Sequence, residues 1–160
     1  MIYNNVLEFV GHTPLVKLNK MVDEDSARVL VKFEGLNVGG SIKTRTAWQM
    51  IKKAEQEGLL NENSIIVEPT SGNQGIGLAL VGAVRGYKTI IIMPDSVSEE
   101  RRKLVEHYGA EVKIIHDDGD IGKCSLNSGQ PLAQLICGGS FTKRQEEDRY
   151  WATVSNLGQN

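Results

Sequence analysis

The sequence has few cysteines, few aromatic residues and no excess of charge of one sign. Its 18 basic and 20 acidic residues give a formal net charge of −2, so no strong field exists to recruit nucleic acid or an anionic membrane. The two cysteines, Cys124 and Cys137, lack metal-ligand spacing with any of the three histidines, and we expect them to be ordinary free thiols. These deficits argue against a nucleic-acid-binding module, a disulfide-stabilised secreted domain and a metal centre.

Long apolar runs are also missing. No run approaches the roughly 20 residues that a membrane-spanning helix requires. Residues 1–5 lack the basic and apolar regions of a signal peptide. With 160 residues, 40% of them hydrophobic, the chain has enough material for one ordinary domain with a core. We therefore expect a cytoplasmic protein with no membrane or nucleic-acid partner.

The middle of the chain alternates between helical and strand patterns. Helices are expected over residues 45–56, 76–85 and 99–108, and strands over residues 64–68, 88–93 and 110–116. Because these strands are largely apolar, they need cover on both faces, which favours a parallel sheet with right-handed crossovers and helices on both sides. The predicted fold class is α/β.

The two ends of the chain differ from this pattern. Residues 14–18 and 28–34 predict two strands of an antiparallel hairpin, joined by a polar turn. After residue 121 the periodicity weakens. The predicted organisation is a hairpin and lysine loop over residues 1–44, an α/β domain over residues 45–124, and a tail over residues 125–160 with no assigned architecture.

A loop of small polar residues separates the strand at 64–68 from the helix at 76–85. It consists of Pro69, Thr70, Ser71, Gly72, Asn73, Gln74 and Gly75. The first N–H groups of a helix have no internal partner and the helix dipole favours an anion, so this position predicts a pocket for a carboxylate. For the loop alone, the alternative is a structural turn followed by a helix cap.

A second candidate site is the glycine-rich turn that delivers Lys43 to the start of the first helix. The lysine is either an ordinary exposed residue or a Schiff-base lysine, which needs a desolvated amine of lowered pKa. Gly39 and Gly40 would let the backbone approach a planar cofactor closely. Since Lys43 and Asn73 belong to neighbouring units of one parallel sheet, both are expected to face one crevice.

The densest charged cluster covers residues 99–103. It follows Ser98, a suitable N-cap, and places acidic residues before basic ones along the expected helix. This order is typical of a solvated helix face. The alternative is a phosphate or polyanion site.

Four motifs in this order resemble the cysteine synthase family. They are Gly11-His12-Thr13-Pro14-Leu15; Gly39-Gly40-Ser41-Ile42-Lys43 with Arg45; Glu68-Pro69-Thr70-Ser71-Gly72-Asn73-Gln74-Gly75-Ile76-Gly77; and Met93-Pro94 followed by Glu100-Arg101-Arg102. That family belongs to the pyridoxal-phosphate enzymes of the tryptophan-synthase β-like fold and has cystathionine β-synthase as a near relative. The resemblance runs from about Val6 to Cys124 and implies the smaller domain of that fold.

The resemblance implies a role for each matching residue. Lys43 would hold pyridoxal 5'-phosphate as a Schiff base and act as the acid and base at the substrate Cα. Asn73 would hydrogen-bond the ring oxygen of the cofactor. The substrate would be bound by Thr70, Ser71, Gly72, Asn73 and Gln74, of which Thr70, Ser71, Gly72 and Gln74 would hold the amino-acid carboxylate. The implied reaction is β-replacement, in which an O-activated serine and sulfide give L-cysteine and a leaving acid. The full-length family implies a homodimer.

The sequence also departs from the family pattern. Thr44 stands where many members carry an acidic residue, and Gln74 stands where threonine is commoner, so O-acetylserine, O-phosphoserine, serine and cysteine all stay open as substrates. Family members continue with a second segment that completes a larger domain and supplies the phosphate loop, so we expect a truncated chain with impaired activity. The alternatives are a non-catalytic fragment or interaction module, and a threonine or serine dehydratase-like enzyme.

Overall fold

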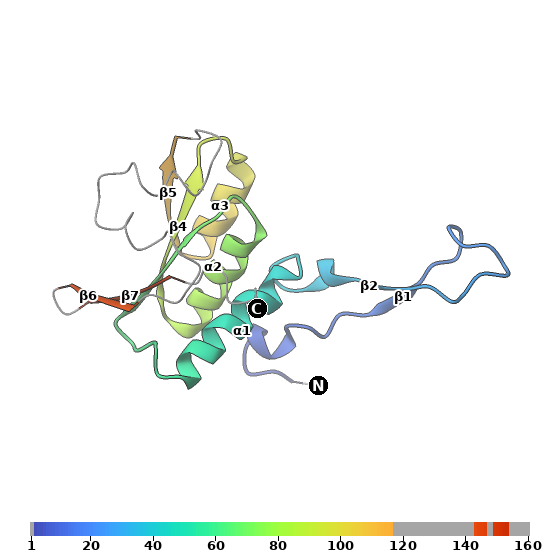
Figure 1. Cartoon of the computed structure of the whole chain (residues 1–160), viewed down its shortest axis with the longest axis horizontal. Coiled ribbons are helices and arrows are strands. Elements are labelled where there is room, and N and C mark those ends of the chain that lie inside the picture. Colours follow the sequence, from blue (N-terminus) through green and yellow to red (C-terminus); the bar gives the residue numbers. More distant parts are fainter. Residues whose placement is uncertain (1, 117–142, 147–148, 154–160) are drawn as a thin grey trace.

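The structure, a computed structural model, describes residues 2–116, 143–146 and 149–153, and the last two ranges are considered as backbone only (Figure 1). Cys124 and Cys137 lie outside the described residues. In chain order the elements are η1 (Val6–Phe9), β1 (Leu15–Lys17), β2 (Leu30–Lys32), η2 (Glu34–Leu36), α1 (Lys43–Gln56), β3 (Ser64–Pro69), α2 (Asn73–Arg85), β4 (Lys88–Pro94), α3 (Glu99–His107), β5 (Glu111–Ile115), β6 (Lys143–Glu146) and β7 (Arg149–Thr153).

The main sheet has the strand order β5-β4-β3-β7-β6. β3, β4 and β5 pair in parallel, with Glu68 opposite Ile91 and Met93 opposite Ile114, which confirms the predicted α/β class. β7 adds to the other edge of β3 in parallel, and β6 pairs with β7 antiparallel. The tail that received no architecture from the sequence therefore contributes two strands to the sheet.

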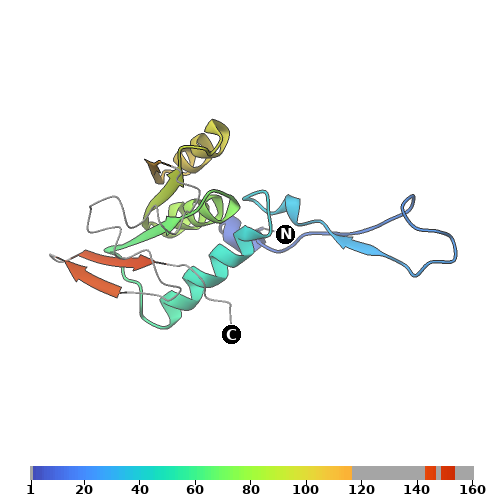
Figure 2. The same ribbon diagram turned by 45° about the horizontal axis from the view of Figure 1, so that its top comes forward.

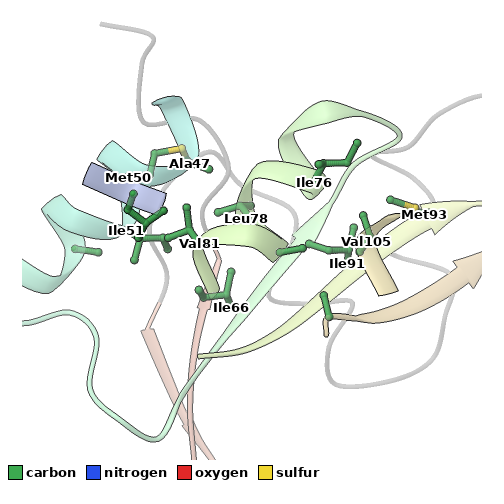
Figure 3. Close-up of a cluster of buried hydrophobic side chains, with 14 of the residues drawn as sticks. Ala47, Met50, Ile51, Ile66, Ile76, Leu78, Val81, Ile91, Met93 and Val105 are labelled. Carbon is green, nitrogen blue, oxygen red and sulfur yellow. The ribbon is translucent and has the colours of Figure 1, made fainter. Parts of the chain in front are cut away.

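The three helices α1, α2 and α3 pack on one face of the sheet. Their apolar residues share one core with Ile66, Ile91 and Met93 of the strands (Figure 3). Ile51, Leu78 and the neighbouring core side chains are fully buried. The structure thus differs from the expectation of helices on both faces, as far as the described helices are concerned. Within the described ranges, no helix combines the length and apolarity needed to span a bilayer.

The opposite face of the sheet is nevertheless apolar and buried. Ile65 and Val67 of β3 and Ile90 and Ile92 of β4 form a second cluster there, with Ile115 packed against it. The alternation of residues between the two clusters follows the two-residue period of a strand. Each β3 residue can therefore be assigned to a face, which places Glu68 on the same side as Ile66.

β1 and β2 form a hairpin that projects away from the α/β body (Figures 1 and 2). The strands pair antiparallel, with Leu15 opposite Lys32 and Lys17 opposite Leu30, which confirms the predicted hairpin. All six strand residues are exposed, including Val16 and Val31. A two-stranded hairpin exposed on both faces buries little apolar surface and adds little stability by itself.

Candidate functional site

Lys43 is the first residue of α1 and follows the glycine-rich turn, as the sequence predicted. The turn is closed by a hydrogen bond of 2.7 Å from the Gly40 N–H to Asn37 O, and Gly40 has φ +72°, a conformation that favours glycine. The N–H of Lys43 donates to Ser41 Oγ at 3.2 Å. The Lys43 side chain is exposed. The turn therefore places the exposed Lys43 side chain at the start of α1, outside the hydrophobic core.

The start of α1 is held tightly against α2 at Gly77. A Cβ atom built on Gly77 would lie 2.9 Å from Lys43 O and 3.0 Å from the Cβ of Ala47. Real Cβ contacts are longer than this, so only glycine allows the two helix backbones to approach so closely. Gly77 lies one helical turn after Asn73, the first residue of α2. The contact therefore fixes the backbone of Lys43 beside the first turns of α2.

A polar network anchors the turn from its other side. The Arg45 guanidinium binds both carboxylate oxygens of Glu34, with Nε to Oε2 at 2.6 Å and Nη2 to Oε1 at 2.8 Å. Arg45 Nη2 also donates to Gly11 O at 2.7 Å. A Cβ on Gly11, which has φ +91°, would lie 2.5 Å from Arg45 Nη1. The network thereby joins the N-terminal segment, the segment after β2 and α1.

Glu34 is the centre of this network. It also accepts hydrogen bonds from Thr13 Oγ1 at 2.7 Å and from Asn37 Nδ2 at 2.7 Å. The hydrogen bonds from Arg45, then that from Thr13, hold the pKa of the Glu34 carboxyl at about 2. Arg45 belongs to one of the four sequence motifs, whereas Glu34 was not predicted as a site residue. Its only signal was an acidic residue at the end of an expected strand.

We expect the Glu34→Gln variant to flatten the acid dependence of stability. The folded-state pKa lies below the ordinary value of 4.5, so the carboxylate stabilises the fold above about pH 4.5, and this contribution is lost as pH falls towards 2. Urea unfolding followed by circular dichroism at several pH values between 3 and 7 would measure the slope. The matched control is Glu62→Gln, at an exposed position. If the free energy of unfolding fell equally steeply with decreasing pH in the wild type and in Glu34→Gln, the expectation would be contradicted.

The polar loop after β3 is shorter than predicted, because α2 begins at Asn73 rather than at residue 76. Gly72 occupies the N-cap in an extended conformation and provides no side-chain cap within the described structure. The loop is held by Thr70, whose N–H donates to Ile92 O at 2.9 Å and whose Oγ1 accepts from the Gly72 N–H at 3.2 Å. The N–H groups of Asn73 and Gln74 therefore lack intrahelical partners, as required for binding an anion.

A cavity of about 700 Å³ lies where three loops meet. The lysine loop contributes Gly39 and Gly40, and the segment around the start of α2 contributes Ser71, Asn73 and Ile76. The third wall is the segment from the end of β4 into α3. That wall comprises Ser96, Val97, Ser98, Glu100, Arg101 and Leu104. The structure thus brings the two predicted site segments to one cavity at the carboxyl ends of β3 and β4.

Not every predicted site residue lines this cavity. Lys43, Thr70, Gly72 and Gln74 are outside its lining, although each adjoins a lining segment in the chain. The Gln74 side chain donates to Met50 Sδ at 3.4 Å and so contacts α1 instead. The roles assigned to these residues therefore stay predictions.

Glu100 and Arg101 were missed as cavity residues. The sequence assigned the cluster at 99–103 to a solvated helix face, and the exposed ion pair between Lys103 and Glu99, at 2.7 Å, fits that interpretation. Arg101, however, donates to Ser71 O at 3.4 Å across the cavity. Ser98 takes the N-cap position of α3 without capping it through its side chain. Helical phase, rather than composition, decides which of these charged side chains faces the loop before α2.

Comparison with known proteins identifies a family model that matches residues 6–148, described as "Pyridoxal-phosphate dependent enzyme". The chain is 57% identical over 111 residues to a cysteine synthase of Flavobacterium sp. and 53% identical over 132 residues to a probable cysteine synthase of Bacillus subtilis. These matches cover 69% and 82% of this chain but 36% and 42% of the relatives. The chain thus spans about two fifths of the length of the curated relatives it matches.

Solved structures of similar fold agree with this result. A hydrogen sulfide-producing enzyme from Fusobacterium nucleatum superimposes with a TM-score of 0.71 at 41% identity, covering 82% of this chain and 45% of that chain. A cysteine synthase from Entamoeba histolytica superimposes with a TM-score of 0.70 at 36% identity, covering 76% of this chain and 37% of that chain.

Proposed function

Since the chain belongs to the family of pyridoxal-phosphate dependent enzymes, we propose that it carries the substrate-binding part of a cysteine synthase-like β-replacement site. The proposed substrates are an O-activated L-serine and sulfide, and the products are L-cysteine and the leaving acid. In the overall reaction, the bond between Cβ and the ester oxygen breaks, a bond between Cβ and sulfur forms, and the leaving group departs as its acid or conjugate base.

The described residues fit the cofactor and substrate in three respects. Gly39 and Gly40 line the cavity with backbone, so a planar ring could approach this wall closely. A Cβ on Gly40 or Gly72 would meet no heavy atom within 4 Å, which leaves open space at both loops. The uncapped start of α2 offers N–H donors for a carboxylate.

Each residue then has a proposed task. Lys43 Nζ would hold the cofactor and move the proton at the substrate Cα, and Asn73 would orient the cofactor ring. Thr70, Ser71, Gly72 and Gln74 would bind the amino-acid carboxylate. For Gln74 this requires its side chain to leave Met50 Sδ, or its backbone N–H to serve instead. Pyridoxal phosphate itself supplies an electron sink for the bonds that break at the substrate.

The observation that carries the proposal is the convergence at one cavity of the lysine loop and the start of α2. The close contact of Gly77 with Lys43 O supports the same arrangement, because it ties the two segments together through their backbones. A shared cavity with backbone donors on one wall and a lysine beside the other is what a two-substrate reaction on an amino acid needs.

The proposal is tested by absorbance spectroscopy of the purified chain with pyridoxal phosphate. We expect a visible band absent from the free cofactor, a change of that band on addition of O-acetylserine, and cysteine on addition of sulfide. Replacing O-acetylserine by L-alanine, which has no leaving group, is the control for the second step. No band at saturating cofactor would overturn cofactor binding by this chain. A band that O-acetylserine leaves unchanged would overturn the assigned substrate.

A further inference from the structure

Two buried side-chain oxygens have no hydrogen-bond partner among the described residues, and both adjoin the candidate site. They are Oε2 of Glu68 and Oγ1 of Thr44. Thr44 directly follows Lys43, and Glu68 precedes the loop that begins at Thr70. An unpartnered buried polar group destabilises the fold, so its presence calls for an explanation. Glu68 is the stronger case because it carries an ionisable group.

The Glu68 side chain lies beneath the helices. It is 6% exposed, and strand alternation places it with Ile66 rather than with Ile65 and Val67. Its register partner on β4 is Ile91, which is fully buried in the helix-side core. On the β4 side of the sheet, the carboxyl is therefore flanked by an apolar side chain.

The first turn of α2 presses on the same region. A Cβ on Gly75 would lie 2.9 Å from Ile91 Cγ2 and 2.7 Å from Thr70 Cγ2. These distances leave no slack between the loop, the start of α2 and the strand next to Glu68. Movement of the strand end, the loop or the helix start would give a charge at Glu68 access to water.

Burial is the cause that raises the pKa of the Glu68 carboxyl to about 8. Charged side chains of the described elements around it are engaged elsewhere or exposed. On α1, Arg45 binds Glu34, Lys53 pairs with Glu57, Lys52 lies over Trp48 and Lys43 is exposed. Arg85 of α2 binds Glu55, and Lys88 of β4 pairs with Glu111. On α3, Arg101 donates to Ser71 O, Arg102 donates to Asp95 O and Lys103 pairs with Glu99. None of these described cations compensates a carboxylate at Glu68.

We propose that Glu68 is a positioning residue for the loop before α2: its neutral carboxyl allows residues 70–72 and the first turn of α2 to pack against the ends of β3 and β4, and its ionisation loosens them. The importance of this loop for catalysis rests on the proposed function. The coupling itself is a property of this chain and can be measured without cofactor or substrate.

The expected pH dependence follows from the direction of the shift. When the loop and the first turn of α2 move away from β3, Glu68 meets water and the pKa of its carboxyl returns to the ordinary value of 4.5, so ionisation favours this open state. The loop is tightest in acid. Its opening becomes easier by as much as tenfold for each pH unit between about 4.5 and about 8, and then levels off, because above that range both states are ionised.

Amide hydrogen exchange of residues 70–77, measured by mass spectrometry and corrected for intrinsic rates, tests the coupling. We expect protection in the wild type to fall between pH 5 and 8 relative to Glu68→Gln, whose protection should not depend on pH in this range. Glu62→Gln is the matched surface control and should follow the wild type. Parallel pH profiles for wild type and Glu68→Gln would overturn the proposal.

A second measurement covers the case in which Glu68→Gln does not fold. In wild-type protein labelled with ¹³C at glutamate carboxyls, one resonance titrating near pH 8 would support the proposal, and titration of every resonance below pH 6 would overturn it. A chain that binds no pyridoxal phosphate but shows this exchange profile would refute the proposed function and leave the coupling intact.

Discussion

Gly77→Val is expected to lower the free energy of unfolding by about 2–3 kcal/mol, in the upper range for overpacking of a tight contact. The new Cβ would lie 2.9 Å from Lys43 O and 3.0 Å from Ala47 Cβ, and neither of these atoms belongs to a flexible side chain. Relief therefore requires α1 to move away from α2. Valine has a better helix propensity than glycine by a few tenths of a kcal/mol, which offsets only a small part of this cost.

The matched control is Ala83→Val in the same helix, at an exposed position. It introduces the same side chain without the contact to α1, so its effect should stay below about 1 kcal/mol. Urea unfolding of both variants, followed by far-ultraviolet circular dichroism, gives the comparison. Equal destabilisation of the two would show that the close approach at Gly77 does not limit the packing of α1.

The same contact illustrates what the sequence could predict. Hydrophobic periodicity identified α1, α2 and α3 and the three parallel strands between and after them, because each buries a regular apolar face. Their starts were less accurate. α1 and α2 begin at Lys43 and Asn73, before the first apolar residue of the pattern, because a polar first turn carries no hydrophobic signal.

Contacts between distant segments were beyond the reach of local patterns. Glu34 meets Arg45 and Thr13 only after the segment following β2 has packed against α1, and Arg101 meets Ser71 only in the folded structure. Glu68 was quoted as part of a motif, but its burial depends on the helices that cover β3. Motifs thus predicted two of the segments that meet at the cavity, whereas the interactions that position their side chains were not predictable from local patterns.

Lys43→Ala is expected to abolish the visible band formed with pyridoxal phosphate and, with it, any cysteine formation. The reason is chemical: alanine has no amine to bond to the cofactor aldehyde, and no base at the substrate Cα. Stability should change little, because the Lys43 side chain is exposed, and alanine is a good helix residue at the first position of α1. Absorbance spectra and circular dichroism of the same samples separate the two effects.

Lys53→Ala provides the control for this variant. Lys53 lies on the same helix and makes a surface ion pair with Glu57 at 3.7 Å, an interaction of small energetic weight. It should retain the band of the wild type. Reduction with borohydride followed by peptide mapping adds a direct readout, since the label should be found on the peptide that contains Lys43 and be lost in Lys43→Ala. If both variants kept the band and the label, the covalent site would have to lie on another lysine, and the turn formed by Gly39 and Gly40 would lose its proposed purpose.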